Sequence, residues 1–377
     1  MKILLIGNYP LDGQHSMARF AEMLEQGLVA AGHEARVVFP EPFFGRLAPS
    51  AAGLGKWLGY LDKFLVFPQR LRRIVRDAGP ETVCHVCDHS NAMYGREFAG
   101  WKWMLTCHDL LAVRSARGEI SEKKTGWTGR ILQEWISRSI ASAPLIACVS
   151  ETTRRDVERL FPEKKENLRV VRNGLNFPYR RMSPEEARPV LEKLFGRVPE
   201  PFLLHVGAEV WYKNRGFVPG VFARVCRSSE RDDLHLVIVG PETPQLAERI
   251  AELGLSGRVR FFQGLEGGQL NALYSCAEAL VFPSLAEGFG WPVVEAMASG
   301  CPVATSNRAP MSDLGAGVAE LFDPADCEDA ASRVAEILRE PAARRGERIL
   351  AGLERARDFS AERMVEGYLE IYRSLGG

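Results

Sequence analysis

The sequence predicts an α/β protein with two consecutive Rossmann-like domains, each built on a doubly wound parallel sheet. Three observations lead to this prediction. The chain has 377 residues, which is too long for one ordinary domain core. Short apolar runs alternate with helical segments, which is typical of parallel βαβ units. The alternation breaks in a loop-rich stretch around 173–201 and restarts at the apolar run 202–206.

The first half of the chain opens with a predicted strand at 2–7, and the loop 8–16 leads to a helix over 17–31. The segment 54–78 is amphipathic, helical and basic. Further strands are expected at the apolar runs 35–39, 82–86, 103–106 and 145–149. We therefore expect an N-terminal Rossmann-like domain over residues 1–185.

The second half repeats the pattern, and its tail over 328–375 is predicted to be nearly all helical. Its strands are expected at 202–206, 234–239, 259–262, 280–282 and 301–304. The expected division continues with a second Rossmann-like domain over 186–357 and a C-terminal helix over 358–377 that returns to the N-terminal domain. Ligands of such sheets bind outside the carboxyl ends of the strands, so the loops there are the candidate site.

Composition points to a soluble globular enzyme, with 46% hydrophobic and 25% charged residues. The formal net charge is zero, which excludes a global attraction to nucleic acid. Residues 1–190 nevertheless carry 28 Lys+Arg and 21 Asp+Glu, which suits an anionic acceptor or a membrane surface but is as easily accidental. The apolar runs are too short for a signal peptide or a membrane span, and the eight cysteines lie mostly in such runs. We expect a cytoplasmic protein, with any membrane contact peripheral and at the inner face.

The stretch 283–300 carries two carboxylates, Glu287 and Glu295, between two apolar strand-like runs. Gly288 and Gly290 would let the loop backbone approach a ligand, and a proline follows where a helix would start. A helix start favours phosphate, so the two acids would more naturally hold sugar hydroxyls. The alternative interpretation is a strand-to-helix turn with one capping acid and one solvated acid.

Two other loops contain candidate ligand-binding side chains. Gly207 ends the run 202–206, and Lys213 follows it, where it can reach a diphosphate or simply be a surface lysine. His108 ends the run 103–106 and can donate to a sugar hydroxyl or a backbone carbonyl, although a lone His–Asp pair is more often structural. No G-x-G-x-x-G turn, Walker loop or nucleophile turn is present, so nicotinamide and acyl-transfer chemistry are not supported.

Two clusters have weaker interpretations. Cys84 and Cys87 suggest zinc, but residues three apart on a strand point to opposite faces, so the signal is weak. The basic segment from Lys63 to Arg76 lies beside apolar residues. It predicts an interfacial membrane contact or an acceptor-phosphate site, or it is a solvated helix face.

Taken together, these residues resemble the retaining glycosyltransferases of family 4, whose fold is two facing Rossmann-like domains called GT-B. The resemblance rests on E-G-F-G-W-P-V-V-E from Glu287 to Glu295, C-V-S-E-T-T-R-R-D-V at 148–157, V-R-N-G at 171–174, the pair Lys213-Asn214, and S-N-R-A-P at 306–310. It covers most of the chain but is dense only from about 148 to 324.

The resemblance implies that the domain over 1–185 binds the acceptor and that the domain over 186–357 binds the nucleotide sugar. It also implies a role for each matching residue. Glu287 would contact the transferred sugar near its reacting carbon, Glu295 would hold the ribose hydroxyls, and Lys213 would bind the diphosphate. His108 would lie near the donor sugar and counts, with Glu287 and Lys213, as catalytic. The other implied donor contacts are Gly13, Gly207, Asn214, Gly264, Leu265, Gly288, Phe289, Gly290 and Trp291.

The sequence departs from the family at three positions. Gln14 stands where a second glycine is common, Ala208 where many members have arginine, and Trp291 where an aliphatic residue is usual. Stabilisation of the leaving group is therefore expected from Lys213, Arg215 or helix dipoles.

The expected function is transfer of a hexose from a nucleotide-diphosphate sugar to a glycan or lipid-linked acceptor, with retention at the anomeric carbon. The setting implied is cell-surface polysaccharide synthesis, with no metal and no cofactor besides the donor. GDP-mannose is the first choice of donor, because S-N-R-A-P and the His–Asp pair resemble mannosyl- or rhamnosyl-type members. The alternatives are a GT-B sugar-nucleotide epimerase or phosphorylase, and a non-catalytic carbohydrate-binding subunit.

Overall fold

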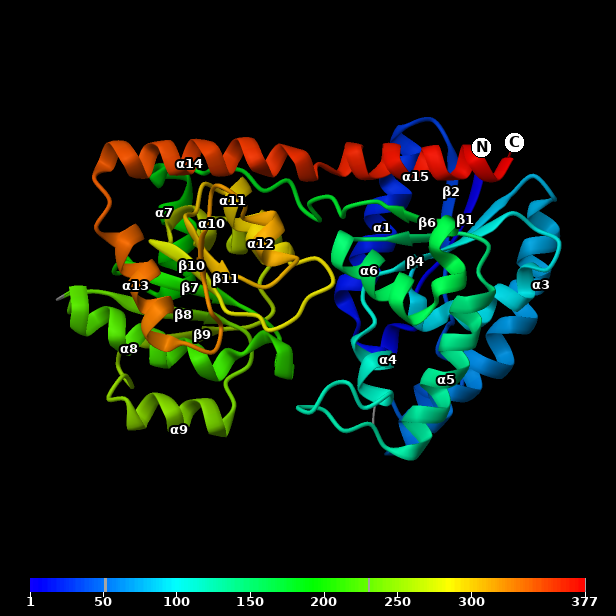
Figure 1. The fold of residues 1–377 in the computed structure, drawn as a ribbon, viewed down its shortest axis with the longest axis horizontal. Helices are drawn as coiled ribbons and strands as arrows, with labels where there is room; N and C mark the ends of the chain where they lie inside the picture. Colours follow the sequence, from blue (N-terminus) through cyan, green and yellow to red (C-terminus); the bar gives the residue numbers. More distant parts are fainter. Residues whose placement is uncertain (51–52, 230, 377) are drawn as a thin grey trace. The chain divides into compact units, whose positions relative to one another are not determined.

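In the computed structural model, which describes residues 1–50, 53–229 and 231–376, the chain divides into two compact units. Unit 1 comprises Met1–Asn176 together with Ala361–Gly377, and unit 2 comprises Phe177–Ser360. Each unit is built on one six-stranded parallel sheet with flanking helices (Figure 1). The predicted fold class is therefore confirmed.

The sheet of unit 1 has the order β2-β1-β3-β4-β5-β6. Its strands are β1 (Lys2–Ile6), β2 (Glu34–Val38), β3 (Val83–Val86), β4 (Trp103–Cys107), β5 (Ile146–Cys148) and β6 (Leu168–Val170). The sequence did not predict β6, because this edge strand has three residues and only Leu168 is buried. A pattern that short has no readable period.

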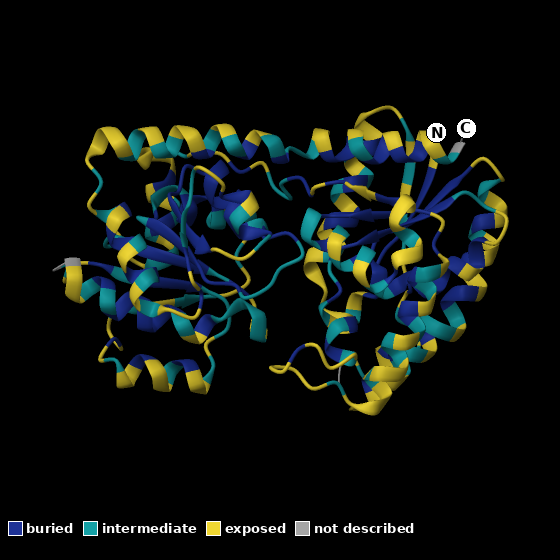
Figure 2. Cartoon of the chain, in the orientation of Figure 1, coloured by how far each residue is buried: buried dark blue, intermediate teal, exposed yellow. Residues whose placement is uncertain are grey.

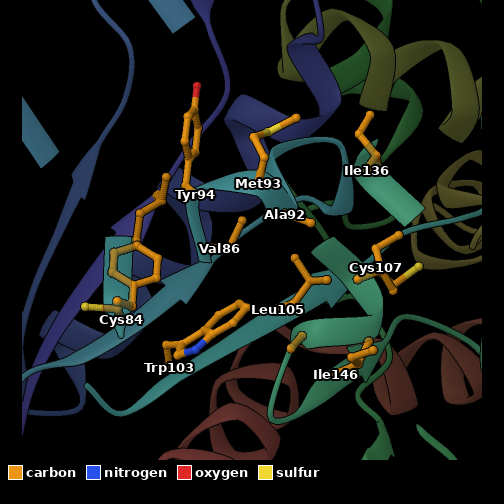
Figure 3. Close-up of a cluster of buried hydrophobic side chains, with 14 of the residues drawn as sticks. Cys84, Val86, Ala92, Met93, Tyr94, Trp103, Leu105, Cys107, Ile136 and Ile146 are labelled. Carbon is orange, nitrogen blue, oxygen red and sulfur yellow. The ribbon is translucent and has the colours of Figure 1, made fainter. Parts of the chain in front are cut away.

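The helices of unit 1 surround a core in which the central strands are buried (Figure 2). They are η1 (Pro10–Asp12), α1 (His15–Ala30), η2 (Gly45–Leu47), α2 (Gly53–Leu61), η3 (Asp62–Val66), α3 (Phe67–Ala78), η4 (His89–Phe98), α4 (Leu111–Ala116), α5 (Trp127–Ser142), α6 (Glu151–Leu160), η5 (Pro162–Asn167) and α15 (Ala361–Gly376). Cys84 lies in this core beside Trp103 (Figure 3), and burial raises the pKa of its thiol to about 12. Its neighbours in this core are apolar, so Cys84 packs there as a small hydrophobic residue.

The C-terminal helix α15 packs within unit 1, against α1 and the sheet (Figure 1). A side chain at Gly27 of α1 would overlap Val365, so the two helices approach closely only because Gly27 has no Cβ. The Tyr372 hydroxyl lies 2.7 Å from His85 Nδ1. The far end of the chain thus contributes hydrogen bonds to the buried face of the first sheet.

The fully buried His85 makes the stability of unit 1 depend on pH. Burial lowers the pKa of His85 to about 3, whereas the pKa of an unfolded histidine is about 6.5. Between these values the unfolded chain binds a proton that the folded chain does not, so stability is lost as the pH falls. The expected slope is about 1.4 kcal/mol of unfolding free energy per pH unit. Urea unfolding between pH 7 and pH 5 should show that the unfolding free energy of the His85→Gln variant depends less steeply on pH than that of the parent protein. The difference in slope should correspond to one proton fewer taken up on unfolding. An unchanged slope, at an unchanged m-value, would contradict this prediction.

The sheet of unit 2 has the order β12-β11-β10-β7-β8-β9. Its strands are β7 (Phe202–Val206), β8 (His235–Val239), β9 (Val259–Phe262), β10 (Ala279–Phe282), β11 (Val303–Ser306) and β12 (Glu320–Phe322). The edge strand β12 has three residues and was not predicted, for the same reason as β6.

The helices of unit 2 include two of the three that make up the predicted helical tail, α13 and α14. They are α7 (Pro184–Phe195), η6 (Trp211–Lys213), η7 (Arg215–Phe217), α8 (Val218–Ser229), α9 (Pro244–Glu252), α10 (Gly267–Cys276), α11 (Trp291–Ala298), α12 (Met311–Leu314), α13 (Cys327–Leu338), α14 (Ala342–Ala356) and η8 (Arg357–Phe359). Within the described ranges of both units, no helix has the length and apolar character of a membrane span.

Both sheets reverse their strand order beside the first strand of the unit. In unit 1, β1 lies between β2 and β3, and in unit 2, β7 lies between β8 and β10. Doubly wound sheets bind ligands at such a reversal, outside the carboxyl ends of the strands. The loops after β7 and β10, and those after β1 and β3, are therefore the places where the fold positions a site.

Candidate functional site

The strand-order reversal of unit 2 brings Lys213 and Glu287 together. Lys213 ends the 3₁₀ turn η6 after β7, and Glu287 lies between β10 and α11. Lys213 Nζ lies 2.7 Å from Glu287 Oε1, and the two side chains are only 14% and 10% exposed. The approach lacks the direction of a hydrogen bond, so this buried carboxylate oxygen has an ion pair and no hydrogen bond. Lys213 Nζ also lies 4.9 Å from the centroid of the Phe282 ring, so a cation–π contact adds to the ion pair.

Asn214 fixes the turn that carries Lys213. Its backbone is left-handed, with φ of 52°, a conformation that asparagine tolerates better than most residues. Its side-chain amide donates to the carbonyls of Pro283, at 3.3 Å, and Pro324, at 2.9 Å. The turn after β7 is therefore tied to the loops after β10 and β12. In this structure Asn214 positions its neighbour, whereas the sequence suggested a donor contact.

Gly207 and His205 form the floor beneath Lys213. A Cβ at Gly207 would lie 3.0 Å from His205 Nε2 and 3.5 Å from Lys213 Cβ, so a side chain there would crowd the lysine. His205 Nδ1 lies 2.9 Å from the Val281 carbonyl, while its buried Nε2 has no partner. Burial lowers the pKa of His205 to about 4, which keeps the ring neutral at pH 7. The sequence analysis missed His205, because a lone histidine in an apolar strand gives no functional signal.

Arg215, one of the three expected sources of leaving-group stabilisation, has protein partners in this structure. Its guanidinium is buried, pairs with Glu209 and donates to the Pro241 carbonyl. It therefore joins the loops after β7 and β8. Stabilisation of a leaving group by Lys213, Arg215 or helix dipoles stays a prediction.

The loop from Gly288 to Trp291 is shaped for α11 to begin at the site. Gly290 precedes the helix with φ of 104°, and a Cβ there would lie 3.2 Å from Leu314 Cδ1, so glycine is required. Phe289 is buried against Phe359, with ring centroids 5.8 Å apart. The Phe289 side chain thus anchors the loop. The N-terminus of α11, which is the positive end of the helix dipole, lies beside the loop that carries the Glu287 carboxylate.

Glu295 is buried in the second turn of α11 and accepts a hydrogen bond from Tyr274 of α10. The Tyr274 hydroxyl lies 2.9 Å from Glu295 Oε2, and burial raises the pKa of this tyrosine well above its usual value. The contact orients the carboxylate that the sequence assigned to the ribose. Nothing in the sequence linked Tyr274 to Glu295, because the two residues lie on different helices.

Tyr274→Phe should loosen this carboxylate. A hydrogen bond to a charged group contributes about 1.5–3 kcal/mol, so the unfolding free energy should fall by that order. If Glu295 holds the nucleotide, affinity for nucleoside diphosphates should fall several-fold in calorimetric titration. Tyr94→Phe is the matched control, because it removes a buried hydroxyl that bonds the Lys63 carbonyl in unit 1. Equal nucleotide affinity in the two variants would contradict the prediction.

Gly264 and Leu265 lie in the loop after β9. The sheet order places β8 between this strand and β7. Gly264 has φ of 64°, and Leu265 is half-buried. One strand, β8, therefore separates the strand that precedes these two predicted donor contacts from β7, the strand that precedes Lys213.

The reversal of unit 1 carries a second polar cluster, around Asp88. Asn8, after β1, donates to Asp88 Oδ2 at 2.6 Å, and His89 Nδ1 lies 3.1 Å from Asp88 Oδ1. Burial raises the pKa of Asp88, but the charge of His89 and these hydrogen bonds outweigh it and hold the pKa well below its usual value. The carboxylate is therefore ionised. Sequence reasoning gave this loop as a candidate without singling out Asp88.

His108 and Gly13, the two residues of unit 1 assigned to the donor, lie on loops of the same sheet edge. His108 Nε2 lies 2.9 Å from the Cys87 carbonyl, which makes Nε2 the donor and leaves Nδ1 as an acceptor. Burial lowers the pKa of His108, so the ring is neutral at pH 7. Gly13 ends η1 with φ of 67°, and Gln14 beside it accepts from Asn8.

Across the described residues, no group of three or more His, Cys, Asp or Glu side chains has the arrangement of a metal site.

The sequence matches known families over nearly all of both units. Residues 17–177 match glycosyltransferase family 4, and residues 191–349 match the family described as glycosyl transferases group 1. The chain therefore belongs to the group 1 glycosyltransferases, of the family 4 type, as the sequence motifs predicted.

Two curated relatives are mannosyltransferases by name. The O-antigen chain mannosyltransferase B of Escherichia coli is 27% identical over 248 residues, which is 65% of this chain and 65% of that protein. The MMP alpha-(1->4)-mannosyltransferase of Mycolicibacterium hassiacum is 31% identical over 220 residues, 57% of this chain and 50% of that protein. The aligned region thus spans half to two thirds of these relatives.

Solved structures share the fold over the whole chain. Sucrose-phosphate synthase from Thermosynechococcus elongatus superimposes with a TM-score of 0.78 at 21% identity, covering 100% of this chain and 99% of that chain. HepE from Anabaena, solved with UDP and glucose, has a TM-score of 0.71 at 17% identity, covering 99% and 100%. At these identities the likeness shows a shared fold.

Proposed function

We propose that this protein is a retaining glycosyltransferase that moves a hexose from a nucleotide-diphosphate sugar to a glycan or lipid-linked acceptor. The observation that carries the proposal is the half-buried Lys213–Glu287 ion pair at the strand-order reversal of unit 2. It combines a cation for a leaving diphosphate with a carboxylate for a sugar, beside the start of α11.

Donor binding would exchange the partners of this pair. The diphosphate replaces Glu287 as the counter-charge of Lys213, and the freed carboxylate turns to the sugar. The bond from the anomeric carbon to the diphosphate breaks, and the acceptor oxygen bonds to the same face of that carbon. The departing phosphate oxygen takes the acceptor's hydroxyl proton. Lys213 and the α11 dipole stabilise the developing negative charge, so the scheme uses no metal.

GDP-mannose is the proposed donor. The names of two relatives, both mannosyltransferases, support it, as does the resemblance of S-N-R-A-P at 306–310 to mannosyl-type members. The HepE structure, which contains UDP and glucose, makes UDP-glucose the main competitor. The O-antigen relative supports a role in cell-surface polysaccharide synthesis. The proposal places the enzyme on the cytoplasmic side of the membrane.

Purified protein should release nucleotide from its donor and form a new glycoside in buffer containing EDTA. A panel of GDP-mannose, UDP-glucose, ADP-glucose and dTDP-sugars identifies the donor, and NMR coupling at the anomeric carbon reports retention or inversion. A non-catalytic carbohydrate-binding subunit would release no nucleotide, and an epimerase would change the sugar without an acceptor. An inverted product would overturn the proposed mechanism, and loss of activity in EDTA would overturn its metal independence.

A further inference from the structure

Unit 1 exposes an unusual share of the chain's large apolar side chains. Of the fifteen that are exposed among the described residues, eight lie in two short segments, 43–65 and 127–131. They are Phe43, Leu47, Leu54, Trp57, Leu61, Leu65, Trp127 and Ile131. Single exposed apolar residues are ordinary, but a concentration of them marks an interaction surface.

The helical segment formed by α2 and η3 places its exposed residues on one side. Leu54, Trp57, Leu61 and Leu65 follow one another at intervals of three and four residues, the spacing of a helical face. Trp57 is 59% exposed, which is extreme for the largest apolar side chain. Away from these residues, the buried Asp62 carboxylate accepts hydrogen bonds from the backbone N–H groups of Phe44 and Gly45. One side of this segment is thus fixed to the domain and the other is open.

A chain of aromatic contacts joins this segment to α5. Trp57 contacts Tyr60, Tyr60 contacts Phe64, and Phe64 contacts Trp135 of α5, with centroids 5.6, 5.2 and 5.1 Å apart. Trp127 and Ile131 lie two turns and one turn, respectively, before Trp135 on the same helix, whose exposed residues are visible in Figure 2. Trp127 is 74% exposed. We call α2, η3 and the first half of α5, with their exposed apolar residues, the apolar face.

The charges around the apolar face are almost all positive. Segments 43–66 and 123–138 together contain seven Lys or Arg and two acids, Asp62 and Glu134, and Asp62 is buried. Two of the seven cations have carboxylate partners, because Lys63 pairs with Asp12 and Arg138 with Glu134. A cavity of about 630 Å³ adjoins the face, and its lining includes Ile131, Trp135, Arg117, Arg130, Arg138 and Glu134. Arginine in an apolar wall suits a phosphate ester at the end of an apolar chain.

This surface differs from the basic segment that the sequence singled out. Between Lys63 and Arg76, Lys63 pairs with Asp12, Arg70 with Glu41 and Arg72 with Glu97, and Phe67 is buried. Three of the cations in that segment are therefore paired with carboxylates of unit 1. The open apolar side chains lie on the neighbouring turns and on α5.

We propose that the apolar face docks on an anionic lipid bilayer, with Trp57, Leu61, Leu65 and Trp127 in the headgroup region and the cavity arginines on lipid phosphates. Apolar and aromatic residues beside Lys and Arg, without exposed acids among them on α2 and η3, are the features of interfacial binding. The proposal deepens the lipid-linked acceptor of the proposed function. The test measures lipid binding in the absence of sugar donor and acceptor. Its outcome is therefore independent of whether the protein transfers a sugar.

The test is co-sedimentation of the full-length protein with phosphatidylcholine vesicles, with and without phosphatidylglycerol. The parent protein should bind the anionic vesicles and lose binding as salt increases. Leu61→Gln combined with Leu65→Gln should weaken binding by about tenfold or more, because both side chains leave the lipid. Leu350→Gln is the control, because it removes an exposed leucine from α14 of unit 2. Leu61, Leu65 and Leu350 are all exposed, so unchanged circular dichroism melting is expected in each variant.

Two further measurements distinguish a lipid bilayer from other binding partners of the apolar face. Brominated lipids should quench the fluorescence of the parent protein, and Trp57→Phe with Trp127→Phe should remove most of that quenching. Arg130→Gln should reduce the preference for phosphatidylglycerol without abolishing binding. Failure of the parent protein to bind anionic vesicles, or equal binding by the Leu61/Leu65 variant, would overturn the proposal. Conversion of a dimer to a monomer by that variant, with no vesicle binding, would assign the face to a second copy of the chain instead.

Discussion

Glu287→Gln should abolish most sugar transfer and yet tighten the binding of nucleoside diphosphates. Loss of a carboxylate that acts on the sugar in the transition state should lower kcat by about 10²–10³-fold. The same change frees Lys213 from its 2.7 Å ion pair, so the lysine no longer has to exchange partners when a diphosphate arrives. An ion pair of this kind contributes about 1 kcal/mol, which corresponds to about fivefold in affinity.

The measurement is calorimetric titration with GDP and UDP, beside steady-state transfer rates. Glu242→Gln is the matched control, because it removes one negative charge from an exposed position in the loop after β8. That variant should keep the transfer rate and the nucleotide affinity of the parent protein. Full activity in Glu287→Gln would overturn the catalytic assignment. Weaker nucleotide binding would show instead that Glu287 does not compete with the diphosphate.

Lys213→Gln should have the second large effect, with the opposite sign in binding. It removes the cation that would meet the diphosphate, so nucleotide affinity should fall by about tenfold and kcat by about 10²-fold. It also leaves the Glu287 carboxylate without its counter-charge at a site only 10% exposed. The unfolding free energy should therefore fall by about 2 kcal/mol in urea titration.

Lys213→Arg and the double variant test the same pair further. Arginine retains the charge, so it should recover part of the affinity but less of kcat, because the guanidinium needs a different geometry. Lys213→Gln combined with Glu287→Gln should be more stable than Lys213→Gln alone, since no unpaired carboxylate is left. If the stability effects of the two substitutions simply add, the ion pair does not exist in solution.

Most of the strands, the helical tail and the family could be predicted from the sequence, because each depends on patterns within a few consecutive residues. Short, mainly apolar runs between helical segments predicted ten of the strands, and the E-G-F-G-W-P-V-V-E motif predicted the family. The edge strands β6 and β12 were not predicted, because their short, partly exposed segments do not establish a period. The turn that holds Lys213 was not predicted either, since a 3₁₀ turn ended by a left-handed Asn214 has no periodic signature.

Tertiary contacts also decide which charged and apolar side chains are available at the surface. In the basic segment from Lys63 to Arg76, carboxylates distant in the sequence pair with several of the cations. The pattern of 54–78 predicted an amphipathic basic helix without indicating which of its apolar residues are exposed. Whether an apolar side chain is covered depends on which elements pack against it, and this information is absent from a linear pattern.

The sequence by itself determined the two-sheet α/β fold, the family, and the two loops that carry Lys213 and Glu287. Only the tertiary structure decided that these two side chains form an ion pair, that Tyr274 holds Glu295, and that His205 lies neutral beneath Gly207. The physical reason is the reversal of strand order beside β7, which places the loop after β10 next to the loop after β7. Local periodicity fixes what each segment becomes, whereas the pairing of strands fixes which charges meet.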